Sequence, residues 1–196
     1  MKKGFTLVEL LIVIAILAVL SVAVVVVLNP AELLKQARDS TRISDLASVN
    51  SAIALYLTDV STPGIGGANN AACSANLSRC MVATTTSPFT TTGNGCAGAG
   101  SANATTTADG NGWVAVDLEN ITGGSPLSRL PIDPVETSTY FYGYACGRGG
   151  SQYNYELDAK MESTKYSAGG GSDVESNTKD GGDNATHYEI GSDLRQ

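Results

Sequence analysis

The hydrophobic pattern separates a long apolar segment near the N-terminus from a mixed remainder. From Leu10 to Leu28 the chain is apolar for 19 residues, and Ser21 is the single polar member. As a helix this segment would extend about 28 Å, close to the hydrocarbon thickness of a bilayer. Lys2 and Lys3 precede it, so the positive-inside rule keeps the N-terminus cytoplasmic. The pattern predicts one membrane-spanning helix followed by an exported domain.

The pattern changes at Asn29-Pro30-Ala31-Glu32, where a proline interrupts the helical run. Pro30 lacks a backbone N–H, so we expect a kink or break there. The same residues predict a new helix start, with Asn29 as the N-cap, Pro30 at the first position and Glu32 in a capping box.

A second helical pattern, amphipathic this time, runs from Ala31 to Asp59. Its apolar residues recur at intervals of three and four and predict one core-facing stripe. These residues are Leu46, Val49, Ile53, Tyr56, Leu57 and Val60. The oppositely charged neighbours Lys35 with Asp39 and Arg42 with Asp45 are expected to solvate a face of this helix, or to pair between subunits.

The remainder of the chain predicts a small sheet with long loops. Residues 61–112 are rich in Gly, Ser, Thr, Asn and Ala, and we expect a long surface loop with little core of its own. Alternating apolar or aromatic positions predict strands in Trp113–Leu118, Thr139–Cys146 and Tyr153–Met161. The expected fold class is α+β, with a long N-terminal helix packed against a small antiparallel sheet of three or more strands.

One carboxylate, Glu9, stands at the start of the apolar region, where burial in a bilayer is costly. At the membrane edge, in the first turn of a helix, the macrodipole would favour it. If the chain were cut after Gly4, Phe5 would gain an α-amine that is positive at neutral pH and lies one helical turn from Glu9. The same amine on a neighbouring subunit would serve equally well. Glu9 would then set the axial register between packed helices.

Two other interpretations of the N-terminal segment stay open. It could be an ordinary secretory signal with Ser21-Val22-Ala23 as the small-residue cleavage site, or an uncleaved membrane anchor. A secretory signal gives no reason for Glu9, nor for an apolar run that continues to Leu28. N-terminal sequencing of the mature protein distinguishes the three interpretations.

Composition and charge exclude several classes of function. The formal charge is −7, and removal of residues 1–4 would take away two lysines and leave −9. Such an acidic chain lacks the basic surface that nucleic-acid binding requires, so we expect no nucleic acid as primary partner. No nucleophile elbow, phosphate loop or metal-ligand pair occurs, and a single histidine limits acid–base chemistry. We therefore do not expect an enzyme.

Four cysteines, Cys73, Cys80, Cys96 and Cys146, lie beyond the apolar segment. In an exported, loop-rich domain an even number of cysteines suggests two disulfides. Three connectivities exist, and we favour Cys73–Cys80 with Cys96–Cys146. No C-x-x-C pair is present, which argues against a zinc site.

The N-terminus resembles that of type IV prepilins and type II secretion pseudopilins. The resemblance covers about 30 residues and rests on Lys2-Lys3-Gly4, Phe5-Thr6-Leu7-Val8-Glu9 and the unbroken apolar run behind them. In that family a prepilin peptidase removes the leader after the glycine, the new N-terminal phenylalanine is methylated, and the glutamate guides assembly. The resemblance implies these roles for Gly4, Phe5 and Glu9, and a loosened helix near Pro30.

The resemblance also implies a domain organisation and a set of partners. Residues 1–4 would be the leader, 5–28 the membrane and filament-core helix, 29–60 its amphipathic half, and 61–196 the exported head, divided into a loop (61–112), a sheet (113–162) and a C-terminal loop region (163–196). The expected partners are further copies of the chain in a helical filament, the prepilin peptidase, an inner-membrane assembly platform and the membrane itself. The chain would be a single-pass inner-membrane protein before assembly and part of an extracellular filament, or a periplasmic pseudopilus, afterwards.

Two alternatives within the family are a major pseudopilin of a type II secretion system and a minor pilin that serves adhesion or DNA uptake. Leu130-Pro131-Ile132-Asp133-Pro134, with tyrosines after it, resembles part of the major pseudopilins. There a tryptophan and a glycine usually follow the second proline, whereas Val135 and Glu136 stand here.

The C-terminal region resembles the glycine- and acid-rich loop that binds calcium in the same pseudopilins. Closely spaced carboxylates on a flexible loop supply the hard oxygen ligands that calcium prefers. Asp180 and Asp183 are the expected ligands, and Asp173 is a weaker candidate. The alternative is a solvated acidic loop without a cation, and no other cofactor is expected.

Overall fold

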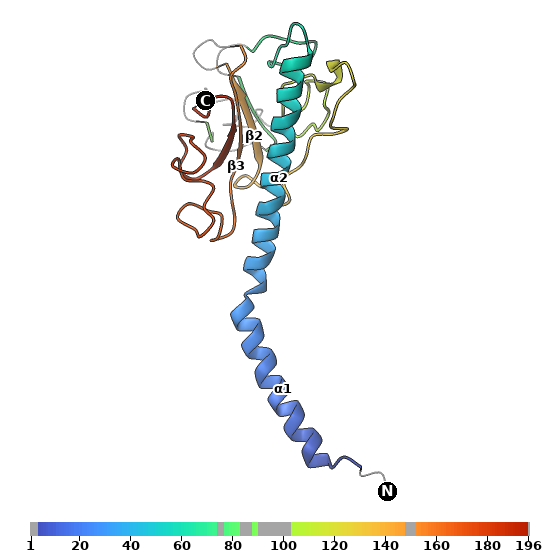
Figure 1. Cartoon of the computed structure of the whole chain (residues 1–196), viewed down its shortest axis with the longest axis vertical. Helices are drawn as coiled ribbons and strands as arrows, with labels where there is room; N and C mark the ends of the chain where they lie inside the picture. Colours follow the sequence, from blue (N-terminus) through green and yellow to red (C-terminus); the bar gives the residue numbers. More distant parts are fainter. Residues whose placement is uncertain (1–3, 74–76, 83–87, 90–102, 148–151, 196) are drawn as a thin grey trace.

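The structure, a computed structural model, describes residues 4–73, 77–82, 88–89, 103–147 and 152–195. Helices α1 (Leu7–Leu28) and α2 (Pro30–Asp59) form one long bent rod, and α2 lies along a small sheet (Figure 1). The other elements are β1 (Leu77–Cys80), the 3-10 helix η1 (Leu118–Asn120), β2 (Tyr142–Cys146), β3 (Tyr155–Ala159) and β4 (Tyr188–Gly191). The predicted α+β layout is confirmed.

The rod bends at Asn29, which ends α1 and precedes α2. Its backbone is left-handed, with φ 39° and ψ 74°, and Pro30 is the first residue of α2. The kink expected near Pro30 is confirmed. The expected capping box is wrong, because the Asn29 side chain makes no cap hydrogen bond. The Glu32 carboxylate instead accepts hydrogen bonds from the backbone N–H and the hydroxyl of Thr164, at 2.7 and 2.8 Å.

The four strands form an antiparallel sheet in the order β1-β2-β3-β4. Successive strand residues point to opposite faces of a sheet. On β3, Tyr155, Leu157 and Ala159 join the main hydrophobic core beside α2. Glu156 and Asp158 therefore point to the face away from α2, and both are fully buried there. The sheet thus separates an apolar layer from an acidic one.

The core beside α2 contains the stripe predicted from the sequence. Leu46, Val49, Ile53 and Tyr56 have no exposed surface, and Leu57 and Val60 pack against them partly buried. Burying an aliphatic or aromatic side chain of this size contributes about 1.5–3 kcal/mol. This stripe therefore holds the head on α2.

The segment from Trp113 to Leu118 is not the strand that the sequence predicts. All of its residues are buried, on both sides, so the alternation of apolar residues does not mark a half-exposed strand. Its backbone bonds to an irregular neighbour: Trp113 N donates to Thr105 O, and Leu118 N donates to Ala108 O. The segment fills the core as irregular backbone, with isolated bridges from Val116 to Gly67 and from Asp117 to Asp109.

Two short strands, β1 and β4, were not expected from the sequence. Each has four residues and lies at an edge of the sheet. Within residues 61–112, Ile65, Met81 and Ala108 are buried in the main cluster, so the described part of this segment contributes side chains to the core of the head. Residues 74–76, 83–87 and 90–102 lie outside the described part of the chain.

Candidate functional site

The N-terminal end of α1 is fixed by a reciprocal pair of side chains. Thr6 is the N-cap, and its hydroxyl accepts a hydrogen bond from Glu9 N at 3.2 Å. The Glu9 carboxylate, through Oε2, accepts from Thr6 N at 2.8 Å and from the Thr6 hydroxyl at 2.7 Å. This capping box satisfies N–H groups that a helix start otherwise leaves open. It also holds Glu9 beside Phe5, the residue before Thr6.

The predicted assembly residues lie together at this end and are open to solvent. Phe5 is 84% exposed, Glu9 is exposed, and a Cβ placed on Gly4 would meet nothing within 4 Å. Among the described residues, Glu9 Oε1 accepts no hydrogen bond in the single chain, so one carboxylate oxygen is available to a partner. Cleavage after Gly4 and methylation of Phe5 stay predictions.

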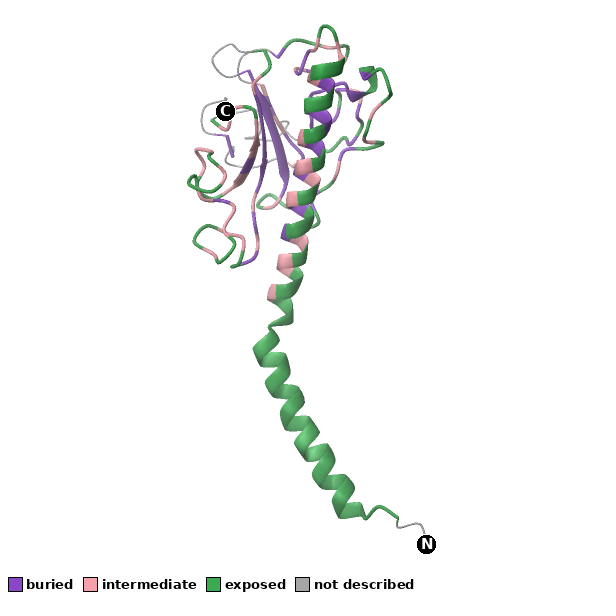
Figure 2. Ribbon diagram, in the orientation of Figure 1, coloured by how far each residue is buried: buried purple, intermediate pink, exposed green. Residues whose placement is uncertain are grey.

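Helix α1 presents apolar side chains on every side. All of its residues are exposed (Figure 2), whereas α2 alternates buried and exposed positions. The Ser21 hydroxyl donates a hydrogen bond to Leu17 O at 2.7 Å, so it needs no hydrogen-bond donor or acceptor outside the helix. Within the described residues, one helical span, Leu7–Asp59, is long and apolar enough to cross a membrane, and its apolar part is not buried within the protein. At 22 residues, α1 extends about 33 Å.

A cluster of buried charges joins α2 to two distant segments, and the sequence analysis missed it. Arg42 is fully buried and donates through Nε and Nη2 to both carboxylate oxygens of Asp133, at 2.6 and 2.9 Å. Its Nη1 contacts Asp39 at 2.8 Å and Glu162 at 2.7 Å. Burial alone would lower the pKa of Arg42, but the carboxylates, Asp133 foremost, raise it above its usual value.

The rest of this cluster shows that the expectation of a solvated face is wrong for Asp39 and Arg42, because both are buried. Asp39 does not pair with Lys35 but accepts the backbone N–H groups of Glu162 and Ser163, at 2.9 and 2.8 Å. Asp45 does not pair with Arg42 but accepts from the Tyr142 hydroxyl at 2.8 Å. Asp39 and Asp45 face the head, and their hydrogen-bond partners there are residues far away in the sequence.

Asp133 gives the Leu-Pro-x-Asp-Pro element a structural role. Besides binding Arg42, its Oδ1 accepts from Val135 N at 2.8 Å and Glu136 N at 3.2 Å, which holds the turn. Glu162 in turn receives two hydrogen bonds from Arg38, at 2.8 and 2.6 Å. These bonds, chiefly the Arg38 bond, lower the pKa of Glu162.

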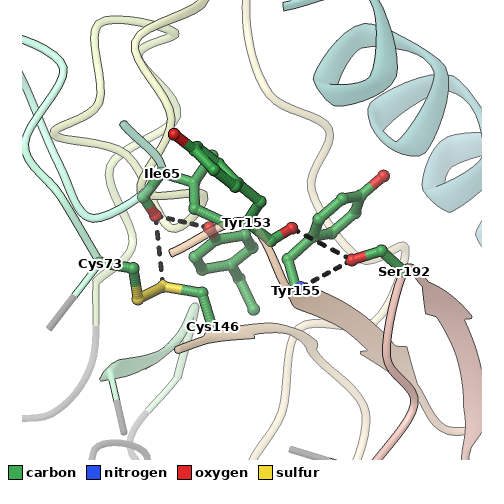
Figure 3. The surroundings of a disulfide bond; sticks show 7 residues. Ile65, Cys73, Cys146, Tyr153, Tyr155 and Ser192 are labelled. Carbon is green, nitrogen blue, oxygen red and sulfur yellow. Dashed lines mark hydrogen bonds between the residues drawn. A yellow bond between two sulfur atoms is a disulfide. The ribbon is translucent and has the colours of Figure 1, made fainter. Parts of the chain in front are cut away.

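The disulfide pairing favoured from the sequence is wrong. Cys73 is bonded to Cys146, on the α2 side of the sheet and beside Ile65 (Figure 3). Cys80 is disulfide-bonded too, but it pairs in register with Gly143, three positions from Cys146, and so points to the opposite face. Cysteines close in sequence are thus kept apart by the sheet. Cys96 lies outside the described residues.

The expected calcium ligands occupy three different environments. Asp173 caps a turn, accepting from the backbone of Glu175 and Ser176 at 2.9 and 3.0 Å. Asp180 accepts through one oxygen from Gly182 N and through the other from Glu189 N, at 3.0 and 3.3 Å.

Asp183 lies in the same loop as Asp180, close enough for its charge to reach Glu189. The structure thus brings the Asp180–Asp183 loop, but not Asp173, to the acidic side of the sheet.

Three carboxylates on that side form a second buried cluster, which the sequence analysis also missed. Glu156 and Asp158 on β3 and Glu189 on β4 offer oxygens that all lie within 4.8 Å of one another. Both oxygens of Asp158 and Oε1 of Glu189 accept no hydrogen bond within the described residues. Burial, and then the charge of Glu189, raise the pKa of Asp158 well above its usual range, and burial likewise raises the pKa of Glu189.

Comparison with known proteins identifies the N-terminal segment. Residues 1–25 match the family model described as the prokaryotic N-terminal methylation motif. No curated protein and no solved structure matches the chain. The matched range contains Gly4, Phe5, Thr6, Glu9 and most of α1. Residues 1–25 therefore carry the N-terminal methylation motif, the leader motif found in type IV pilins and pseudopilins.

Proposed function

We propose that this chain is the structural subunit of a type IV pilus-like filament. Proteins with this leader are structural and self-assemble in a membrane context. The observation that carries the proposal is α1, a helix of 22 residues with exposed apolar side chains all around and Glu9 fixed at its start. A helix that is hydrophobic on all sides requires lipid or neighbouring helices around it. In this proposal α1 leaves the lipid of the membrane and packs against the helices of neighbouring subunits.

In this proposal the subunit is inserted in the inner membrane with its N-terminus in the cytoplasm. A prepilin peptidase removes residues 1–4, and methylation follows at the new N-terminus, Phe5. An inner-membrane assembly platform then moves the subunit into the filament, with the head outside. The chain performs no catalysis itself.

Glu9 is the group that recognises the neighbouring subunit. Cleavage gives Phe5 an α-amine with an ordinary pKa of about 7.7–8.0, so that most of it is charged at neutral pH. Thr6 occupies Glu9 Oε2 in the single chain, and Oε1 is the oxygen that would receive the amine of a neighbour. Each incoming helix is thereby placed at one axial position.

The decisive experiment compares Glu9→Val with the matched variant Ser21→Ala in the same helix. We expect both variants to insert in the membrane at normal levels. Glu9→Val should reduce filaments at least tenfold by electron microscopy, whereas Ser21→Ala should leave their number unchanged. Filaments of normal number from Glu9→Val would contradict the proposed assembly step. Mass spectrometry of the mature chain should find it beginning at a methylated Phe5.

A second candidate is the major pseudopilin of a secretion system. The Leu130–Pro134 element favours it, because Asp133 there has a defined role in binding Arg42 and holding the turn. Surface fibres in the electron microscope would favour the pilus, and their absence together with loss of protein secretion in a deletion strain would favour the pseudopilus.

A further inference from the structure

The segment that follows β3 runs back along α2 towards α1. The Tyr155 hydroxyl, at the start of β3, donates to Asn50 Oδ1 at 2.7 Å, whereas Thr164, beyond the end of β3, binds Glu32. Asn50 and Glu32 are about 27 Å apart along α2, at about 1.5 Å per residue. The loops after β3, orange in Figure 1, accordingly lie beside the part of α2 that is nearer to α1.

The first turns of α2 lie at the depth of the lipid headgroups when α1 spans a bilayer. Leu28 ends α1 and its apolar run, and Glu32 lies about 6 Å further along the rod. The polar layer on each side of the hydrocarbon core is about 5–8 Å thick. Thr164 is bonded to Glu32 and is therefore brought to the same layer. The base of the head, meaning residues 31–35 and 163–168, thus lies at the membrane surface.

The base of the head carries side chains that suit a lipid surface. Leu33 and Leu34 are 50% and 62% exposed. Lys35 and Lys165 form no salt bridge within the described residues. Tyr166 stands beside Lys165, whose Nζ lies 4.9 Å from the centre of the tyrosine ring. Lysine and tyrosine side chains place an apolar body against acyl chains and keep a polar tip among the headgroups.

The charge of the base is opposite to that of the chain as a whole. Lys35 and Lys165 outnumber the single carboxylate, Glu32, so the base has a formal charge of +1, whereas the whole chain carries −7. Glu32 is also engaged, because its Oε1 accepts the N–H and the hydroxyl of Thr164. The next carboxylate of this loop, Asp173, holds a turn of its own. Anionic lipids attract basic side chains next to a membrane span, so the base is complementary to them.

We infer that the base of the head binds anionic phospholipids at the surface of the membrane in which α1 is inserted. Lys35 and Lys165 contact the lipid phosphates, and Leu33, Leu34 and Tyr166 reach the boundary with the acyl chains. The inference rests on the membrane-inserted state of the proposed function, and it adds a second attachment to that made by α1. This contact fixes how the head is rotated about the rod, and it is broken when α1 leaves the membrane.

The test uses the full chain in phosphatidylglycerol vesicles whose acyl chains carry bromine close to the headgroups, because bromine quenches tryptophan fluorescence at short range. Tyr166→Trp places a probe in the base. Its matched control is Tyr153→Trp, since Tyr153 is 49% exposed and lies two residues before the tyrosine that binds Asn50. The emission that Tyr166→Trp adds to that of Trp113 should lose at least half of its intensity. The emission added by Tyr153→Trp should lose less than about a tenth.

The charges of the base are tested in the Tyr166→Trp chain. Lys35→Gln combined with Lys165→Gln removes both cations, and quenching should fall at least twofold. Vesicles of brominated phosphatidylcholine, which has no net charge, should produce a similar fall with the lysines in place. Lys179→Gln, which removes an exposed lysine outside the base, should leave quenching in phosphatidylglycerol unchanged.

A second probe, Ala168→Trp, lies at an exposed position of the same loop and leaves Tyr166 in place. If neither base probe is quenched more strongly than Tyr153→Trp in chains that float with the vesicles, this inference alone is overturned. Unchanged quenching in the double lysine variant overturns it too. Chains that do not float would overturn the membrane anchoring as well, whereas a failure to form filaments would leave the vesicle results unaffected.

Discussion

Two buried clusters of carboxylates lie on opposite faces of one sheet, and they differ in what neutralises them. On the α2 side, Asp39, Asp133 and Glu162 surround Arg42, with Arg38 at the margin. On the far side, Glu156, Asp158 and Glu189 meet one another without a guanidinium in the described residues. In the first cluster Arg42 binds the carboxylates that surround it, whereas in the second both oxygens of Asp158 accept no hydrogen bond within the described residues. Burial alone therefore does not determine whether a carboxylate has a bonded partner.

The largest effect is expected from breaking the Arg42 cluster. Arg42→Met keeps most of the side-chain volume but leaves three carboxylates without their shared cation. Removing one partner of a buried ion pair typically costs about 3–5 kcal/mol. Urea unfolding of the full chain in detergent should show this loss, while the exposed Arg129→Met should change the free energy of unfolding by less than about 0.5 kcal/mol. A loss below about 1 kcal/mol in Arg42→Met would mean that the two clusters are not different in kind.

The far-side cluster should respond in the opposite direction. Asp158→Asn replaces a buried acid, whose oxygens accept no hydrogen bond within the described residues, by an amide that cannot ionise, and it should increase the free energy of unfolding by about 1–3 kcal/mol because no charge then has to be buried. The matched change on the α2 side, Asp133→Asn, should decrease it, because Arg42 then loses its bidentate partner. Urea unfolding in the presence of a chelator measures both. Destabilisation by Asp158→Asn without metal would show that this carboxylate has a protein partner after all.

The smallest effect is expected from acid at the margin of the Arg42 cluster. The pKa of Glu162 is lower in the folded chain than in the unfolded chain because Arg38 and Arg42 bind the carboxylate. Its contribution to stability is therefore present above about pH 4.5, the ordinary value of a glutamate, and is lost as the pH falls through the lower folded pKa. Glu162→Gln should lose less Tm than the wild type between pH 6 and pH 3.

The difference for Glu162→Gln should correspond to about 1 kcal/mol or less, since Arg38 is partly exposed. Glu119→Gln should follow the wild-type curve. Parallel curves for the wild type and Glu162→Gln would rule out a role for this pair in acid stability.

Local patterns were enough to predict the helices and the middle of the sheet. The three- and four-residue spacing of Leu46, Val49 and Ile53 marks the buried face of α2, and the aromatic run around Tyr142 and Tyr144 marks β2. The N-terminal motif could be recognised from Gly4 to Glu9 because its meaning depends on spacing alone. Features that depend on neighbours in sequence were therefore accessible.

What could not be predicted depends on neighbours in space. Arg42 does bind Asp39 one turn away, but the carboxylate that it binds through two nitrogens, Asp133, lies 91 residues along the chain. Acidic residues alternating with apolar ones, as in β3, normally indicate a solvated face. Glu156 and Asp158 are nevertheless fully buried, next to Glu189, against whose carboxylate Gly182 packs closely. Sequence spacing likewise gave no sign that Cys73 and Cys80 point to opposite faces.

The alternation along β3 has a consequence for how the head folds. A slip of one residue in strand pairing would turn every side chain of β3 over. Asp158 would then enter the hydrophobic core beside α2, and Leu157 would lie on the face of the sheet that carries the carboxylate cluster. Both placements are unfavourable, so the slipped register would lose stability on both faces of the sheet. The alternation of apolar and acidic residues therefore specifies the register of β3, although this strand has only five residues.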